Sequence, residues 1–228
     1  MLPFTNLVFT ELAGADVITC HLAYSPVASL SYVVEHSGAT DIAVLDLHGR
    51  ISDLSYSLSP TQATVTCRKR SDYYAVLVRR REYLTLDQGL VQYVDTWTGN
   101  GGRYALWFFP PQATVLAIRP PTPVAPLYQW QGSPLLATLT NEAQISVQYT
   151  IQGPPVPPLS SAPFDLEQLL GDFAPPHGTE GEILCAGLAA LPDVADLLGG
   201  AVALRAILAQ KLALNLAAPG TMSLLQTA

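Results

Sequence analysis

Residues 144–163 read QISVQYTIQGPPVPPLSSAP, and two kinds of local pattern meet within this stretch. From Ile145 to Ile151, apolar side chains alternate with Ser, Gln and Thr, which is the period-two pattern of a strand with one apolar and one polar face. From Pro154 to Pro163, five of ten residues are proline, which has no backbone N–H to give to a sheet or a helix. The stretch therefore predicts the end of a β-rich region.

The chain before this boundary is rich in short apolar or alternating runs of β-branched and aromatic residues, which favour strands. The runs are Ile42–Leu47, Ile51–Leu58, Ala63–Cys67 and Tyr73–Val78. The prolines Pro110-Pro111 and Pro120-Pro121 bracket a further apolar run, Ala113 to Ile118. Because proline cannot donate to a sheet ladder, we expect that run to form an edge strand.

Residues 91–109, VQYVDTWTGNGGRYALWFF, look like a hairpin. Val91 to Thr98 and Arg103 to Phe109 are strand-like, and Gly99-Asn100-Gly101-Gly102 lies between them. Glycine and asparagine tolerate the positive φ that tight hairpin turns need. The pattern predicts that the two flanking strands pair with each other.

After Pro163 the pattern becomes helical. Thr179 and Glu182 have the spacing of a capping box, and Leu204 to Ala217 is apolar around most of a helical wheel. The fold class expected is α+β: a mainly antiparallel β domain, sandwich or barrel-like, at 1–152, a semi-rigid linker at 153–163, and a helical segment at 164–228. Eleven linker residues in polyproline II span roughly 34 Å, which leaves open whether the helices pack on their own domain or on a neighbour.

Composition narrows the functional classes. Hydrophobic residues make up 49% of the chain and charged residues only 13%, against about 25% in ordinary domains. A surface this poor in charge is typical of chains whose outside is covered by partners. The net charge of −7 disfavours nucleic acid as a partner.

Cys20, Cys67 and Cys185 are odd in number and widely spaced, which favours free thiols in a reducing compartment. The first twenty residues lack the basic start of a signal peptide, and no apolar run is long enough to span a bilayer. We therefore expect an intracellular compartment or a virion, with no membrane span and no secretion by a signal peptide.

The triplet Arg79-Arg80-Arg81 follows the strand-like run that starts at Tyr73. One interpretation is a contact to phosphate or another ligand, with tyrosines as stacking faces. The favoured interpretation is a solvated strand end or ion pairs to an acidic neighbour. We keep all three arginines as candidate interface or ligand contacts.

The three tryptophans also have either a structural or a binding interpretation. Trp97 and Trp107 lie in strand-like runs, where aromatic residues are usually core or interface. Trp130 follows a proline-rich arm together with Tyr128 and stands between two glutamines. We predict that Trp130 is an exposed anchor, since tryptophan is enriched at binding hot spots.

No catalytic, metal or cofactor motif has both the spacing and the context that its chemistry needs. His177, Glu180, Glu182 and Cys185 lack paired metal-ligand spacing. Cys20 and His21 are adjacent in a strand-like run, so their side chains point to opposite faces, and we expect a buried cysteine beside a histidine at an edge. We therefore predict no enzyme activity, no cofactor, no bound metal and no small-molecule substrate.

The leading hypothesis is a non-enzymatic structural protein of a large assembly, a virion capsid or capsid-decorating protein that forms homo-oligomers. Extended proline-rich arms, polar strand faces and low charge are typical of subunits that neighbours cover. The alternative is a β-rich module that binds a glycan or a protein through exposed aromatic residues.

Overall fold

The structure of the chain is a computed structural model, and it describes residues 6–151 apart from 36–39, 47, 82, 100, 121–126 and 131. Each regular element in these residues is a β-strand, and nearly all paired strands run antiparallel. The expected antiparallel β domain is therefore confirmed in its coarse form. The predicted linker at 153–163 and helical segment at 164–228 lie outside the described residues. No helix in the described part is long and apolar enough to cross a membrane.

Eight strands form the large sheet. They are β1 (Asn6–Ala13), β2 (Asp16–Tyr24), β4 (Thr40–Asp46), β5 (Gly49–Arg50), β8 (Tyr73–Arg80), β11 (Arg103–Phe108), β13 (Leu127–Trp130) and β14 (Ser133–Thr140). Their order across the sheet is β13-β14-β11-β1-β2-β8-β4-β5. The strands β1 and β11 run parallel, and they join an early part of the chain to a late one.

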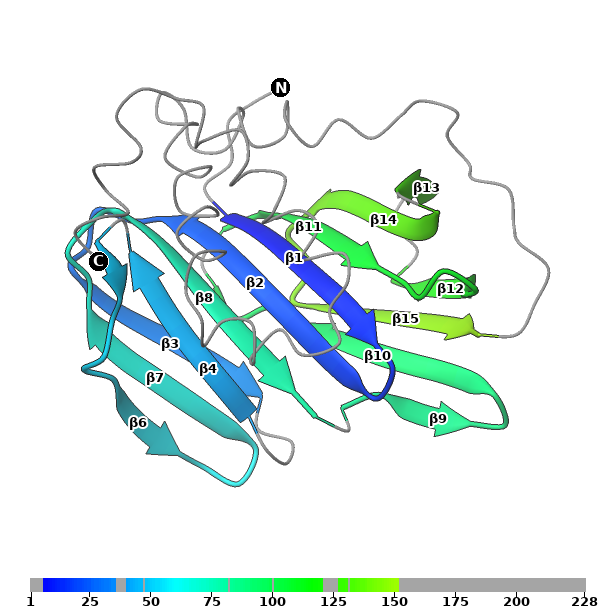
Figure 1. Cartoon of the computed structure of the whole chain (residues 1–228), viewed down its shortest axis with the longest axis horizontal. Helices are drawn as coiled ribbons and strands as arrows, with labels where there is room; N and C mark the ends of the chain where they lie inside the picture. The colour runs from blue at the N-terminus through cyan, green and yellow to red at the C-terminus, as the bar shows by residue number, and fades with distance from the viewer. Residues whose placement is uncertain are drawn as a thin grey trace.

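Two smaller sheets accompany the large one. The four-stranded sheet consists of β12 (Thr114–Arg119), β15 (Gln144–Thr150), β10 (Leu90–Thr96) and β9 (Thr85–Asp87), in this order. The three-stranded sheet consists of β3 (Ser29–Glu35), β7 (Gln62–Arg68) and β6 (Ser55–Leu58), in this order. Figure 1 shows the three-stranded sheet at one end of the molecule and the four-stranded sheet toward the other.

Both smaller sheets pack on the same face of the large sheet, here called the first face. Leu12, Val17 and Trp107 of the first face join the four-stranded sheet in an aromatic core. Val44 and Val76 of the same face join the three-stranded sheet in an aliphatic core. The fold is thus a sandwich in which two small sheets share one broad partner sheet.

The opposite face of the large sheet, the second face, is also apolar. Because side chains alternate along a strand, the neighbours of the first-face residues point there. Phe9, Cys20, Leu77 and Leu106 are examples, and all four are buried. The two faces together explain the near-continuous apolar runs of the large sheet, since strands buried on both faces lose the period-two pattern.

Several strand predictions are confirmed. Ile145, Val147 and Tyr149 are fully buried, and the polar residues between them are not. The run bracketed by prolines is β12, at the edge of the four-stranded sheet, as expected. The run Ile51–Leu58 is only partly a strand, because its first four residues lie outside β6.

The hairpin prediction is wrong. β10 lies in the four-stranded sheet, where it pairs with β15 and β9, whereas β11 lies in the large sheet, where it pairs with β1 and β14. The glycine-rich segment between them crosses from one sheet to the other, and Gly101 has a φ of 81° there. A positive φ serves such a crossing as well as a tight turn, so the local pattern does not distinguish the two. The crossing is what creates the candidate site below.

Candidate functional site

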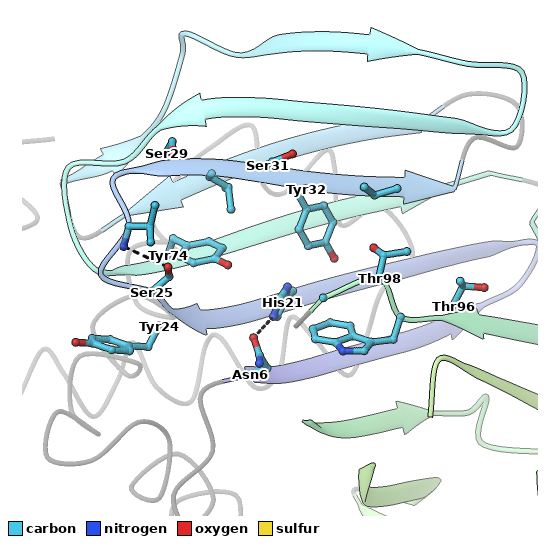
Figure 2. Close-up of a pocket in the computed structure, with 15 residues that line it drawn as sticks. Asn6, His21, Tyr24, Ser25, Ser29, Ser31, Tyr32, Tyr74, Thr96 and Thr98 are labelled. Atoms are coloured by element: carbon cyan, nitrogen blue, oxygen red, sulfur yellow. Dashed lines mark hydrogen bonds between the residues drawn. The ribbon is translucent and has the colours of Figure 1, made fainter. Parts of the chain in front are cut away.

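A strip of the first face lies between the two cores, where neither small sheet covers the large sheet completely. This strip, here called the seam, contains a cavity of about 400 Å³. Asn6 and His21 of the large sheet contribute to it, β3 borders one side, and the crossing segment Thr96–Gly99 borders the other. Figure 2 shows the cavity with these elements around it. Its volume lies within the range of small-molecule sites, about 300–1,000 Å³.

The residues that line the seam cavity are aromatic or hydroxyl-bearing for the most part. The aromatic ones are Tyr24, Tyr32, Tyr74 and Trp97, and the hydroxyl-bearing ones include Ser25, Ser29, Ser31, Thr96 and Thr98. None of the described lining residues is Asp, Glu, Lys or Arg. The described lining residues therefore offer ring faces and hydrogen bonds but no charged group.

His21 lies at the centre of the aromatic rings. Its ring centroid is 5.0 Å from that of Trp97, 5.6 Å from that of Tyr32 and 6.2 Å from that of Tyr74. Burial, and then the positive charge of Arg103, lower the pKa of His21 to about 3. The imidazole is therefore neutral at physiological pH and packs as an aromatic ring with two polar edges.

The tautomer of His21 follows from its neighbour. His21 Nε2 lies 3.2 Å from Asn6 Oδ1, while Asn6 Nδ2 donates to the carbonyl of Gly102 at 3.3 Å. Since the amide oxygen only accepts, Nε2 carries the proton and Nδ1 keeps a lone pair. His21 Nδ1 is buried and meets no hydrogen-bond donor among the described residues. The seam thus holds one buried acceptor whose partner is missing from the described chain.

Trp97 is held in place by two contacts. Its Nε1 donates to the carbonyl of Gly101 at 3.0 Å, and the guanidinium of Arg103 lies 5.0 Å from its ring centroid. Arg103 is itself buried and forms an ion pair with Asp95, which also accepts from Tyr93 at 3.0 Å. The charge behind Trp97 is therefore balanced within the protein, and the indole is presented as a fixed ring face.

The arginine triplet does not form one patch. Arg80 is buried on the first face, where it donates to Thr19 Oγ1 at 2.9 Å and its guanidinium lies 4.5 Å from the ring centroid of Tyr83. Arg79 points to the second face and pairs with Asp16. Arg81 pairs with Asp41 at 2.9 Å on the surface. Within the described residues, each arginine of the triplet is thus engaged in contacts of this chain.

Tyr128 and Trp130 lie on β13, at the edge of the large sheet. Trp130 is half-buried rather than fully exposed, and its ring meets that of Phe108 at a centroid distance of 5.4 Å. Four strands separate β13 from the arginines on β8, which is about 24 Å at 4.8 Å per strand. The structure does not bring these candidate residues together into one site.

The other predicted residues fall as follows. Trp107 is buried in the aromatic core, as expected. Cys20 and His21 do point to opposite faces, but the expectation of an edge position for His21 is wrong, because β2 lies in the middle of the large sheet. Within the described residues, no group of three or more His, Cys, Asp or Glu is arranged to hold a metal ion. The histidine and cysteine cluster at 177–185 lies outside them.

Sequence reasoning missed the seam cavity as a site. Its members come from five separate strands and the loops beside them, so no spacing in the chain connects Asn6, His21 and Trp97. One usable signal was the polar break in the apolar strand β2, where Thr19 and His21 alternate with apolar residues. A histidine inside an apolar central strand indicates a polar spot on one face of a sheet.

No protein-family model and no curated protein matches the sequence. Among solved structures, the chain is similar to aminopeptidase A of Legionella pneumophila, determined in complex with aspartic acid, at 6% identity and a TM-score of 0.37. The match covers 65% of this chain and 21% of that one. At this level of similarity, function has to be argued from the residues of this chain alone.

Proposed function

We propose that the protein is a non-enzymatic structural subunit that assembles with copies of itself, as a virion capsid or capsid-decorating protein does. The observation that carries the proposal is that the outermost strand of each small sheet has exposed apolar side chains on the side that faces the core. Edge strands present unpaired backbone groups, and soluble proteins usually protect them with charge, proline or a bulge. The edge strand β6 has neither a charge nor a proline beside its exposed apolar side chains, whereas β9 carries one charged residue, Asp87, beside its exposed leucine.

The first such edge is β6. Tyr56 pairs with Val65 and Leu58 pairs with Ala63, and both partners belong to the aliphatic core. Tyr56 and Leu58 therefore lie on the core side of the three-stranded sheet, yet they are 53% and 69% exposed. The large sheet therefore leaves these two side chains largely uncovered.

The second edge is β9. Leu86 pairs with Val91, a member of the aromatic core, so it lies on the core side of the four-stranded sheet. Leu86 is nevertheless 70% exposed. Both small sheets thus expose apolar side chains at their outermost strand, although they lie at different places on the large sheet.

A second copy of the chain is the partner that β6 fits best. The strand has the sequence Ser-Tyr-Ser-Leu and carries no charge, so two chains of net charge −7 can approach there with little repulsion. Two β6 strands related by a two-fold axis would pair antiparallel and continue the three-stranded sheet. Each copy would then cover the exposed tyrosine and leucine of the other.

The test is the native mass of the full chain, measured by light scattering and negative-stain imaging. We expect a species well above 24.4 kDa, and Leu58→Lys should reduce its mass or shift it to the monomer. Leu139→Lys is the matched control, because Leu139 is 58% exposed on β14 of the large sheet, at the opposite end of the molecule from β6 (Figure 1). A wild-type chain that stays monomeric at micromolar concentration contradicts the proposal.

The alternative function is a β-rich module that binds a glycan or a protein. The half-buried residues Tyr128 and Trp130 on the edge strand β13 support it only weakly, since Trp130 packs on Phe108. The seam cavity is a better candidate for such a role, and it is compatible with assembly because no residue of β6 or β9 lines it.

A further inference from the structure

We propose that the seam cavity binds an uncharged saccharide, with Trp97 as the stacking platform and hydroxyl-bearing side chains of β3 and the crossing segment as hydrogen-bond partners. The proposal rests on the juxtaposition of Trp97 with the phenol groups of Tyr32 and Tyr74 and the hydroxyl of Thr98 around one cavity. It goes beyond the assembly function, because it assigns a ligand to a part of the fold that the proposed interface does not use.

The lack of charged side chains among the described lining residues favours a neutral ligand. A charged group that enters a partly closed cavity loses hydration and needs a counter-charge in return. The described lining residues supply none, and His21 is neutral. Arg103 lies behind Trp97, but Asp95 balances its charge. Lys69, near Tyr74, is engaged by the carbonyls of Ser25 and Ser71 at 2.8 and 3.1 Å.

The fixed ring faces select a ligand with a flat apolar side. Saccharide rings have such a side, formed by their C–H groups, and tryptophan offers the largest flat partner for it. Trp97 is already held by Gly101 and Arg103, so little conformational entropy is lost when a ligand packs on it. The preorganised indole distinguishes this wall from an ordinary surface tryptophan.

The polar groups select a ligand with several hydroxyls. A purely apolar ligand would take water from the hydroxyls of Tyr32, Tyr74 and Thr98 without replacing its hydrogen bonds, which costs roughly 1–3 kcal/mol per buried group. A hydroxylated ring pairs with them instead. His21 contributes its neutral ring to the same wall, next to Tyr32. A saccharide satisfies all three conditions at once.

The experiment titrates the full-length protein with a panel of saccharides, followed by calorimetry and ligand-observed NMR. The neutral members are glucose, galactose, mannose, N-acetylglucosamine and their disaccharides, and the charged counterparts are glucuronate and glucosamine. We expect at least one neutral saccharide to bind, and to bind about tenfold or more tightly than its charged counterparts. Binding confined to the charged members, or no binding by any member, overturns the proposal.

Two substitutions locate the site. Trp97→Ala should weaken binding about tenfold or more, and Trp130→Ala is the matched control that should leave it unchanged. Gly99→Ala offers a milder test, because the new Cβ would lie 2.4 Å from Trp97 Cζ2 and must displace the indole. Its circular dichroism and unfolding midpoint show whether the fold is retained. Binding that survives in both folded variants overturns the assignment to the seam.

The outcome is independent of the assembly. Leu58→Lys, which should change the native mass, should leave saccharide affinity unchanged, since Leu58 does not line the cavity. A chain that is monomeric but binds the saccharide removes only the assembly function. A chain that assembles but binds no panel member removes only the present inference.

Discussion

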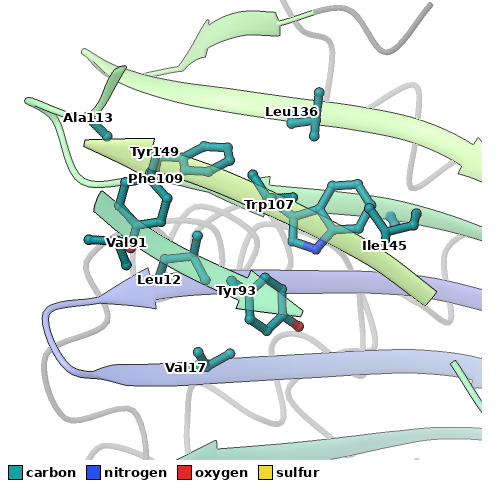
Figure 3. Close-up of a cluster of buried hydrophobic side chains, with 12 residues drawn as sticks. Leu12, Val17, Val91, Tyr93, Trp107, Phe109, Ala113, Leu136, Ile145 and Tyr149 are labelled. Atoms are coloured by element: carbon teal, nitrogen blue, oxygen red, sulfur yellow. The ribbon is translucent and has the colours of Figure 1, made fainter. Parts of the chain in front are cut away.

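The aromatic core and the aliphatic core differ in content although the same large sheet supplies one side of each. The aromatic core contains Trp107, Tyr93, Tyr149 and Phe109, with the last two rings meeting edge to face at 5.3 Å (Figure 3). The aliphatic core consists mainly of valine and alanine, including Val76 and Ala63. One sheet therefore supports two separately packed layers, and the polar seam is the boundary between them.

The largest effect should come from the aromatic core. Trp107→Ala removes a fully buried indole, and we expect a loss of about 4 kcal/mol in the free energy of unfolding, from lost burial and from the cavity left behind. Val76→Ala in the aliphatic core should cost about 2 kcal/mol, because fewer buried carbons are removed. Urea unfolding measures both. Equal losses of unfolding free energy in the two variants would contradict the larger contribution expected from the aromatic core.

The next effect tests the charged pair that separates the aromatic core from the seam. Arg103 and Asp95 are both buried and form an ion pair. Arg103→Met leaves the carboxylate of Asp95 buried without its partner, which should cost about 3 kcal/mol in unfolding free energy. The double variant Arg103→Met with Asp95→Leu should recover most of that loss. If the double variant is no more stable than Arg103→Met, the pair is not coupled as the geometry indicates.

The smallest effect comes from the seam and depends on pH. The pKa of His21 is about 3 in the folded chain and about 6.5 when unfolded, so the unfolded chain gains a proton first as the pH falls. The stabilisation by a neutral His21 is complete above the unfolded pKa and is lost as the pH falls toward the folded one. Between pH 7 and pH 5 the loss should be about 2 kcal/mol.

His21→Gln should remove this part of the pH dependence, because glutamine does not titrate. The comparison requires urea unfolding of both chains at pH 7 and pH 5, so that any general destabilisation by the substitution cancels. The same pH dependence in the variant and the wild type would assign it to groups other than His21.

Much of the fold followed from local pattern, and the reason is visible in individual strands. The alternation from Ile145 to Tyr149 marked a strand with one buried face, and the prolines around β12 marked an edge. The partners of the strands did not follow, because β10 and β11 carry hairpin-like signals and yet lie in different sheets. Partner choice depends on contacts between residues distant in the chain, which no local pattern records.

The site was harder to predict than the fold for the same reason. Arg79 and Arg81 pair with Asp16 and Asp41, and no spacing in the sequence indicates these partners, because neither is adjacent in the chain. His21 was recognised as a neighbour of Cys20 and not as a neighbour of Trp97, which lies 5.0 Å away in space. Only the crossing between sheets brings those two rings together.

The parallel pairing of β1 with β11 has a consequence for synthesis on the ribosome. Leu7 pairs with Tyr104, whereas β1, β2, β4 and β8 need only residues up to Arg80 to pair with one another. The half of the large sheet that holds the aliphatic core is therefore complete in sequence well before β11 emerges. Until then β1, a central strand of the finished sheet, is an open edge. A nascent chain that pauses between these points presents its future centre to other chains as a template for pairing.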